Sequence, residues 1–211
     1  GGTVAVDQVY QEMRQGHAEA LMPMIADVMS RSDLGFSKLD RIAVGVGPGS
    51  FTGTRVGIAA ARGLALATGA GLVCFTSLRI IAAAVRESAV MNTGAIAVAL
   101  EAGRGEIYFE VVGADGGTAG AAVATSVAGA VELLPTGTVT LAGAAANLVA
   151  IAAGCRGDLS VVVSEIRWPR AATLARLAFE APAASEPPLP QYLRPADARP
   201  QPGSGLVERR T

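Results

Sequence analysis

Residues 41–66, RIAVGVGPGSFTGTRVGIAAARGLAL, combine a strand, a glycine-rich turn and a helix in immediate succession. Branched apolar residues alternate with small ones over residues 42–46, which predicts a mostly buried strand. The Gly-Pro-Gly sequence that follows ends the strand, because proline lacks an N–H and glycine reaches backbone angles that other residues avoid. Ser50 or Thr52 then caps a helix through a side-chain oxygen, and the alanine-rich sequence extends it to residue 66.

The turn between this strand and helix has two interpretations. Unpaired N–H groups at a helix N-terminus suit an anion, so Gly47, Gly49 and Ser50 are candidates for a nucleotide or phosphate turn. The other interpretation is a tight turn that only connects two packed elements. The sequence is not a Walker loop, because no Gly-Lys-Ser/Thr follows. It also lacks the GxGxxG pattern with an acidic residue about 20 positions further on.

Small residues recur along the helix that the turn begins. Gly53, Gly57 and Ala61 follow one another at a spacing of four, and glycine inside a helix costs about 1 kcal/mol relative to alanine. Such a face lets another helix approach closely, either within the same lobe or across a subunit interface. An apolar face at helical spacing over residues 17–31 offers a companion helix. Two arginines seven residues apart, Arg55 and Arg62, either pair with carboxylates of a partner or are solvated.

Composition limits the class of protein. The 211 residues are enough for one large domain or two small ones, and 51% hydrophobic with only 4% aromatic residues suits α/β layers packed by small side chains. A formal net charge of −1 gives no global basic field for nucleic acid. No apolar run is long enough for a membrane span, so we expect a cytoplasmic protein without membrane association.

Residue types for catalysis or metal binding do not form a recognisable set. His17 is the only histidine, and one histidine cannot supply a His-based metal cage. No Ser/His/Asp set and no Walker lysine is present. The sequence therefore predicts neither a catalytic residue nor a metal site.

Strand and helix patterns alternate along the rest of the chain, which indicates the α/β class. We predict an N-terminal lobe over residues 1–90, a C-terminal lobe over residues 91–195 and a disordered tail over residues 196–211. The expected strands cover residues 3–13, 42–46, 72–75, 95–100, 107–112, 138–142 and 159–163. The expected helices cover residues 17–31, 51–66, 78–88, 126–134, 144–153 and 170–180.

The string GPGSFTGTRVG at residues 47–57, followed by ARGLA at 61–65, resembles the signature of the TsaB (YeaZ) family. Further segments match that family in the same order, namely GHAEALMP at 16–23, FTSL at 75–78, ALEAGRGEIY at 99–108 and PQYLR at 190–194. Two features depart from the family. Its members begin with a strand and turn like an actin-type phosphate loop, which is not found here, and Glu101 stands where they usually carry Asp.

The resemblance implies an actin-like ATPase fold, that of the acetate and sugar kinases, Hsp70 and actin, with two related lobes of mixed sheets flanked by helices. It implies a non-catalytic subunit that binds TsaD as a heterodimer, with TsaE joining the assembly. The complex moves a threonylcarbamoyl group to the adenosine next to the anticodon of tRNA, so tRNA is reached indirectly. No cofactor is implied for this subunit alone, and ATP is a ligand of the complex. Without TsaD, we expect the apolar face of the two helices to pair with a second copy as a homodimer.

The resemblance also favours the subunit-interface interpretation of the two helices. The residues then predicted to contact the partner are Leu21, Met24, Ile25, Val28, Gly53, Arg55, Gly57, Ala60, Ala61 and Arg62. The alternative function is an ATP-dependent transferase or a metallo-glycoprotease-like enzyme of the same fold. The first would need the phosphate loop, and the second would need a histidine one turn after His17, where the chain has Leu21.

Overall fold

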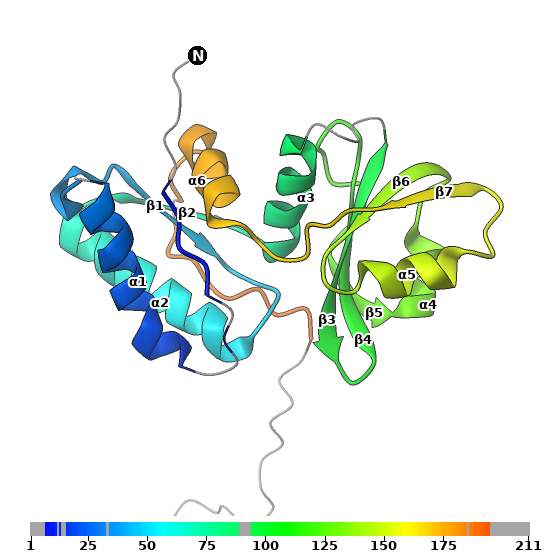
Figure 1. The fold of residues 1–211 in the computed structure, drawn as a ribbon, viewed down its shortest axis with the longest axis horizontal. Helices are drawn as coiled ribbons and strands as arrows, with labels where there is room; N and C mark the ends of the chain where they lie inside the picture. Colours follow the sequence, from blue (N-terminus) through cyan, green and yellow to red (C-terminus); the bar gives the residue numbers. More distant parts are fainter. Residues whose placement is uncertain are drawn as a thin grey trace, which may run out of the picture.

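The chain forms two α/β lobes on either side of helix α3 (Ser77–Glu87), as Figure 1 shows. The structure is a computed structural model that describes residues 7–11, 13, 16–32, 34–88, 94–184 and 186–194. The first lobe contains a two-stranded parallel sheet and the second a five-stranded mixed sheet, so the predicted α/β class is confirmed.

The first lobe is built on the strand and helix of the glycine-rich stretch. Strand β1 (Arg41–Gly45) pairs in parallel with β2 (Gly71–Phe75), and helices α2 (Phe51–Thr68) and α6 (Ala171–Glu180) pack against them. Helix α1 (His17–Arg31) packs on α2, and a 3-10 turn, η1 (Phe36–Lys38), leads into β1. The core of this lobe consists of Val44, Val46, Ile58 and Ala61.

Helix α2 begins where its sequence predicts and ends two residues beyond the predicted end at residue 66. The Ser50 hydroxyl accepts a hydrogen bond from the Gly53 N–H at 3.2 Å, which satisfies one of the free donors of the first turn. Gly69 ends the helix in the left-handed conformation, at φ 76°, and its N–H donates to Ala65 O.

The second lobe places a sheet in the order β5-β4-β3-β6-β7 between two layers of helices. Its strands are β3 (Ala95–Gly103), β4 (Glu106–Val112), β5 (Val123–Ser126), β6 (Gly137–Ala142) and β7 (Leu159–Val163). Helices α4 (Val127–Leu133) and α5 (Ala146–Ala153) pack over one face, and α3 packs over the other. The central strand β3 is therefore buried on both faces, which explains its nearly continuous apolar sequence.

The end of the chain returns to the first lobe. Helix α6 packs on β1 and β2, Ala184 N–H donates to Leu72 O at 2.6 Å, and Gln191 N–H donates to Val46 O at 2.8 Å. The predicted division into residues 1–90 and 91–195 does not anticipate this return. The alternation of apolar and polar residues predicts where each strand and helix begins and ends. It does not predict that α6 covers β1 and β2, because that depends on which strand faces other helices leave exposed.

Most predicted elements are confirmed, with small changes at their ends. The strand expected over residues 3–13 is wrong for its described part, because residues 7–11 and 13 have no regular structure, and residues 3–6 and 12 lie outside the described residues. Strand β5 and η1 were not expected, because four residues and three residues give no readable periodicity. The tail at 196–211 also lies outside the described residues.

Among the described helices, none combines the length and the apolar character that crossing a bilayer would require.

Candidate functional site

The glycine-rich turn is packed tightly between the start of α3 and the segment that contains Gln191. Gly47 has a φ of 90°, and a Cβ placed on it would lie 3.4 Å from Gln191 O, so a side chain here would be strained. Its carbonyl oxygen accepts a hydrogen bond of 2.7 Å from Ser77 N–H at the start of α3. Pro48 is buried, whereas Gly49 and Ser50 are exposed. These contacts support the structural role of the turn, and nucleotide binding by Gly47, Gly49 and Ser50 stays a prediction.

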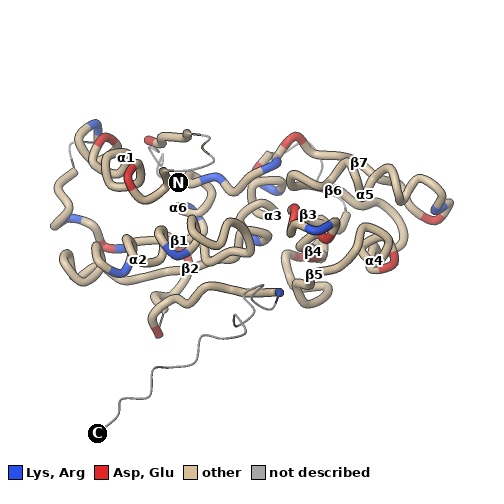
Figure 2. Tube along the Cα trace, turned by 90° about the horizontal axis from the view of Figure 1, so that it is seen from below, with Lys and Arg blue, Asp and Glu red and all other residues tan. Residues whose placement is uncertain are grey.

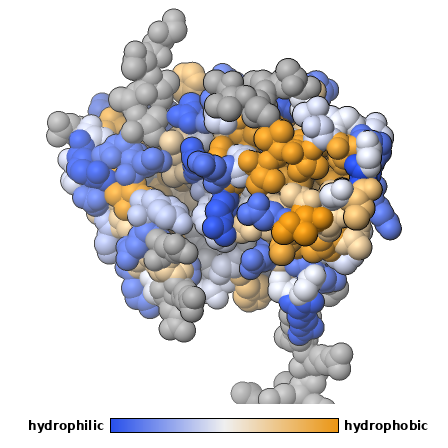
Figure 3. All heavy atoms as spheres, turned by 45° about the vertical axis from the view of Figure 1, so that its right-hand side comes forward, coloured by the Kyte–Doolittle hydropathy of each residue, from blue (hydrophilic) through white to orange (hydrophobic). Residues whose placement is uncertain are grey.

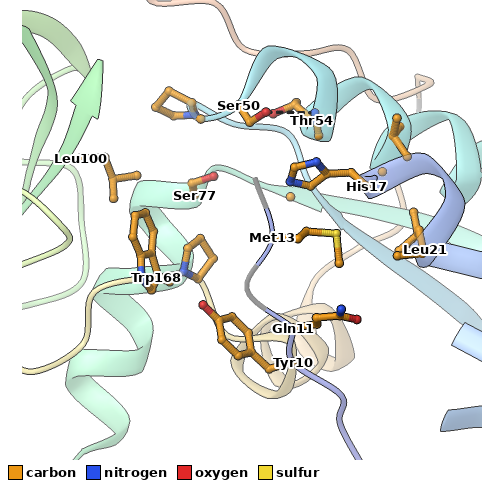
Figure 4. Close-up of a pocket in the computed structure, with 18 of the residues that line it drawn as sticks. Tyr10, Gln11, Met13, His17, Leu21, Ser50, Thr54, Ser77, Leu100 and Trp168 are labelled. Carbon is orange, nitrogen blue, oxygen red and sulfur yellow. Dashed lines mark hydrogen bonds between the residues drawn. The ribbon is translucent and has the colours of Figure 1, made fainter. Parts of the chain in front are cut away.

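A cleft of about 670 Å³ opens beside this turn, between the two lobes. Figure 4 shows Trp168 and Ser77 on one side of the cleft and His17 and Leu21 on the other. The turn contributes Ser50, and the second lobe contributes Leu100 together with the exposed carboxylate Glu101. The lining is mostly apolar with a few hydroxyl groups, which is typical of a small-molecule site rather than a charged one.

Three helices begin at this cleft. Ser50 caps α2, and Thr76 Oγ1 caps α3 by accepting a hydrogen bond of 3.1 Å from Arg79 N–H. His17 starts α1 across the cleft, and its Cδ2 lies 3.6 Å from the position that a Cβ on Gly53 would take. Among the described residues, no three His, Cys, Asp or Glu side chains are grouped closely enough to hold a metal ion.

The predicted partner residues of α1 lie on an open helix. Leu21, Met24, Ile25 and Val28 are only partly buried, and no residue of α1 is fully buried although it packs on α2. Leu21 and Met24 also line the cleft. Met22 adds a further apolar side chain that is 45% exposed.

The predicted partner residues of α2 divide between two sides of the helix. A Cβ on Gly57 would lie 3.8 Å from Val44 Cγ2 of the sheet, and Ala61 is buried in the lobe core with 5% exposure. The expectation that Ala61 meets a partner is therefore corrected, because β1 needs a small residue beneath it for close helix packing. Gly53 and Ala60 are partly buried, and only Arg55 and Arg62 are exposed.

Arg55 is exposed but is also held by the segment at 192–194, and its contact with a partner stays a prediction. Its Nε donates a hydrogen bond of 2.8 Å to the Tyr192 hydroxyl, and its guanidinium lies 3.5 Å from the centre of the Phe51 ring. Arg194 continues the attachment, donating to Ala102 O at 2.8 Å and pairing with Glu106 at 3.1 Å. The segment at 192–194 is therefore attached to both lobes, through Arg55 and through Ala102 and Glu106.

Sequence reasoning missed several exposed or charged residues near these surfaces. Leu66 of α2 is 89% exposed, one turn after Arg62 on the same side of the helix, and Gly63 has no atom within 4 Å of a Cβ placed on it. In the sequence, Leu66 continues an apolar run, so nothing predicts that its side chain is exposed. Trp168, the only tryptophan, lies in a connection between β7 and α6 that has no periodicity.

A buried ion pair also escaped the sequence analysis. Arg79 Nε of α3 lies 2.6 Å from Glu110 Oε1 of β4, and burial raises the pKa of Glu110 in spite of this arginine. The other carboxylate oxygen, Oε2, is buried and has no hydrogen-bond partner among the described residues. Because Arg79 belongs to α3 and Glu110 to β4, the pair joins α3 to the sheet of the second lobe. Glu110 does not line the interlobe cleft.

A second ion pair joins α3 to α6. Glu87 accepts hydrogen bonds from Arg176 Nε at 3.0 Å and from the Thr173 hydroxyl at 2.8 Å, and the Arg176 bond is the main cause that lowers the pKa of Glu87. A lowered pKa in the folded state stabilises the fold above the ordinary pKa of about 4.3, and this contribution is lost as the pH falls through the folded-state pKa.

We therefore expect Glu87→Gln to lower the free energy of unfolding by about 0.5 kcal/mol at pH 7, the size of a largely exposed ion pair. The difference between the variant and the wild type should shrink as the pH falls below 4. Urea unfolding at several pH values measures this, and a difference that is constant with pH would contradict it.

Comparison with known proteins identifies the family of the chain. A family model described as TsaD, tRNA N6-adenosine threonylcarbamoyltransferase, matches residues 9–183. The tRNA threonylcarbamoyladenosine biosynthesis protein TsaB of Haemophilus influenzae is 35% identical over 96 residues, 46% of this chain and 40% of that protein. The Escherichia coli protein of the same name is 35% identical over 95 residues, 44% of this chain and 39% of that protein. The chain thus spans about two fifths of the length of these curated relatives.

A solved structure agrees over a longer part of the chain. The crystal structure of a Pseudomonas aeruginosa protein described as similar to peptidase YEAZ has a TM-score of 0.69 and 25% identity, covering 84% of each chain. The family model covers more than half of this chain, and the relatives are TsaB and YeaZ proteins with the actin-like ATPase fold. The chain belongs to the TsaD family and, within it, to the TsaB/YeaZ group.

Proposed function

We propose that this chain is a non-catalytic subunit that binds a TsaD-type protein and supports threonylcarbamoyl transfer to the adenosine beside the anticodon of tRNA. Membership of the TsaB/YeaZ group supports this role, because the curated relatives are named tRNA threonylcarbamoyladenosine biosynthesis proteins. In the proposal the chemistry takes place on the partner. TsaE joins the assembly, ATP is a ligand of the complex, and tRNA is reached through the partner.

One observation carries the proposal, namely the open face of the α1–α2 pair. Helix α2 has 18 residues and only two charged side chains, and the side of it that faces away from the sheet presents Ala59, Gly63 and Leu66 to solvent. Helix α1 contributes half-exposed apolar residues and no buried ones. Two adjacent helices with small and apolar exposed residues suit the close approach of helices from another subunit.

The cleft favours a second candidate, a nucleotide-dependent enzyme. Ser50 and Ser77 lie at the N-termini of two helices that begin at the cleft, and helix N-termini favour anionic groups. Trp168 lines the same cleft, so its fluorescence reports on occupancy. This candidate requires catalysis by the chain without a partner.

A reconstituted assay separates the two candidates. Transfer to tRNA from threonylcarbamoyl adenylate is measured with the TsaD-type protein of the same cell, with and without this chain. We expect no ATP turnover by the chain alone, unchanged Trp168 fluorescence with ATP, and stimulation of transfer by about tenfold or more through positioning of the partner. ATP turnover by the chain alone that is lost in Ser50→Ala or Glu101→Gln would instead establish the enzyme.

A further inference from the structure

The last described segment of the chain, residues 186–194, crosses from the first lobe to the second. It follows α6 in the sequence and has no regular secondary structure. Figure 1 and Figure 2 both show it leaving the side of β1 and β2 and running toward the hairpin of β3 and β4. Prolines at positions 187, 188 and 190 fix φ there, so the segment has few backbone conformations to lose when it is held in place.

Hydrogen bonds attach this segment to the first lobe. Gln191 N–H donates to Val46 O at 2.8 Å, directly before the glycine-rich turn. The Tyr192 hydroxyl accepts a hydrogen bond of 2.8 Å from Arg55 Nε of α2. The Phe51 ring lies beside the Tyr192 ring, with the two ring centres 5.8 Å apart. The segment is therefore fixed both to the turn and to the helix that the turn begins.

The next two residues attach the segment to the second lobe. Leu193 is partly buried and packs against the core between α3 and the five-stranded sheet. Arg194 donates to Ala102 O of β3 at 2.8 Å, and its Nε lies 3.1 Å from Glu106 Oε2 of β4. The Arg194 side chain is only 17% exposed, so salt screens this ion pair less than a fully exposed one.

The attached parts of the two lobes both line the interlobe cleft. The glycine-rich turn lies on one side and the end of β3 on the other, and the lining residues that they contribute are Pro48, Gly49, Ser50, Leu100 and Glu101. Only one residue separates Tyr192 on the first lobe from Arg194 on the second. Their Cα atoms therefore cannot lie more than about 7 Å apart, whatever the conformation of the segment.

We propose that residues 191–194 form an interlobe clasp that fixes the width of the cleft. With both ends of the clasp attached, the turn and the end of β3 can separate only by breaking its hydrogen bonds or its ion pair. When the Arg194 end is released, the connections from β2 to α3 and from β7 to α6 keep the lobes joined but let the cleft open. This inference goes beyond the proposed function and does not rest on it, because the clasp lies within one chain.

Distances between the lobes of the full chain test the clasp. One spin label is attached to the exposed native Cys155 after α5, and the other is attached at the exposed position Ala67→Cys of α2. Cys74→Ser removes the remaining cysteine. Pulsed electron paramagnetic resonance then gives the distribution of distances between the two labels, and this background should show a single narrow distribution.

Distances between different molecules must be kept out of this measurement. Figure 3, in which the second lobe comes forward, shows apolar side chains gathered on that side. Exposed apolar residues of this lobe include Leu148 and Ile151 of α5, at 51% and 79% exposure. The labelled chain is therefore diluted with unlabelled chain, so that any contact between copies adds no label-to-label distance.

Two variants release the clasp in different ways. Arg194→Gln removes the ion pair with Glu106. Insertion of two glycines between Tyr192 and Leu193 keeps every anchor and adds up to about 7 Å of chain. Each variant should broaden the distribution and lengthen the mean distance by about 5 Å, within that added length. The control Arg62→Gln makes the same charge change at an exposed arginine of α2 outside the clasp, and it should leave the distribution narrow.

Thermal unfolding verifies that each variant is folded, and the insertion variant alone decides if Arg194→Gln is not. Unchanged distances in both variants would overturn the inference. Wider distances in Arg194→Gln but not in the insertion variant would also overturn it, because the arginine would then act on the β3–β4 hairpin and not through the length of the clasp.

Discussion

Replacing Leu66 by aspartate is expected to weaken the complex with a TsaD-type protein by about 30-fold or more, the loss typical of an interface hot spot. Leu66 is 89% exposed and lies at the C-terminal end of the open face of α2, one turn after Gly63. A carboxylate at this position would have to be buried without a partner when another helix covers the face. The free chain should keep its stability, because the leucine contacts almost nothing in it.

The matched control is Leu133→Asp, which makes the same change at a 52% exposed leucine on α4 of the second lobe. It should bind the partner like the wild type. Isothermal titration calorimetry gives both dissociation constants, and thermal unfolding verifies that both variants are folded. Equal affinities for the wild type and Leu66→Asp would remove α2 from the interface.

Replacing Ala61 by tryptophan is expected to destabilise the first lobe by about 3 kcal/mol, as overpacking does in a filled core. Ala61 packs with Val44, Val46 and Ile58 beneath β1, and no space for an indole exists there. The sequence alone suggests the opposite result, a folded chain that fails to bind, because it cannot tell the inner side of α2 from the outer.

Ala59→Trp is the control on the same helix, since Ala59 is exposed two residues earlier. This variant should unfold like the wild type and should block the partner by steric bulk. Urea denaturation monitored by circular dichroism distinguishes the two alanines. If Ala61→Trp unfolded at the wild-type urea concentration, the packing of α2 on β1 would have to be different from that described.

The sequence predicts the elements of this fold well because its signals are local. The cap at Ser50 appears where expected, and Gly69 in the left-handed conformation and the cap at Thr76 likewise act over a single turn. The apolar runs of β3 and β6 likewise reflect burial on both faces of the sheet.

The candidate site is less predictable because it depends on contacts between distant segments. Arg55 is paired with Tyr192, which is 137 residues away, and no local pattern carries that information. The same holds for the Arg79–Glu110 pair. The sequence around Glu110 does not distinguish this buried carboxylate from a solvent-exposed one on a hairpin strand. The return of α6 to the first sheet is a further case.

The most direct test of the proposed function is hydrogen exchange measured by mass spectrometry on the chain with and without the TsaD-type protein. Stable protection should appear in peptides from α1 and from the C-terminal half of α2, around Gly63 and Leu66, with little change in α4, α5 or β7. Protection confined to the second lobe, or no protection at stoichiometric concentrations well above the dissociation constant, would contradict the assignment of this helix pair as the partner surface.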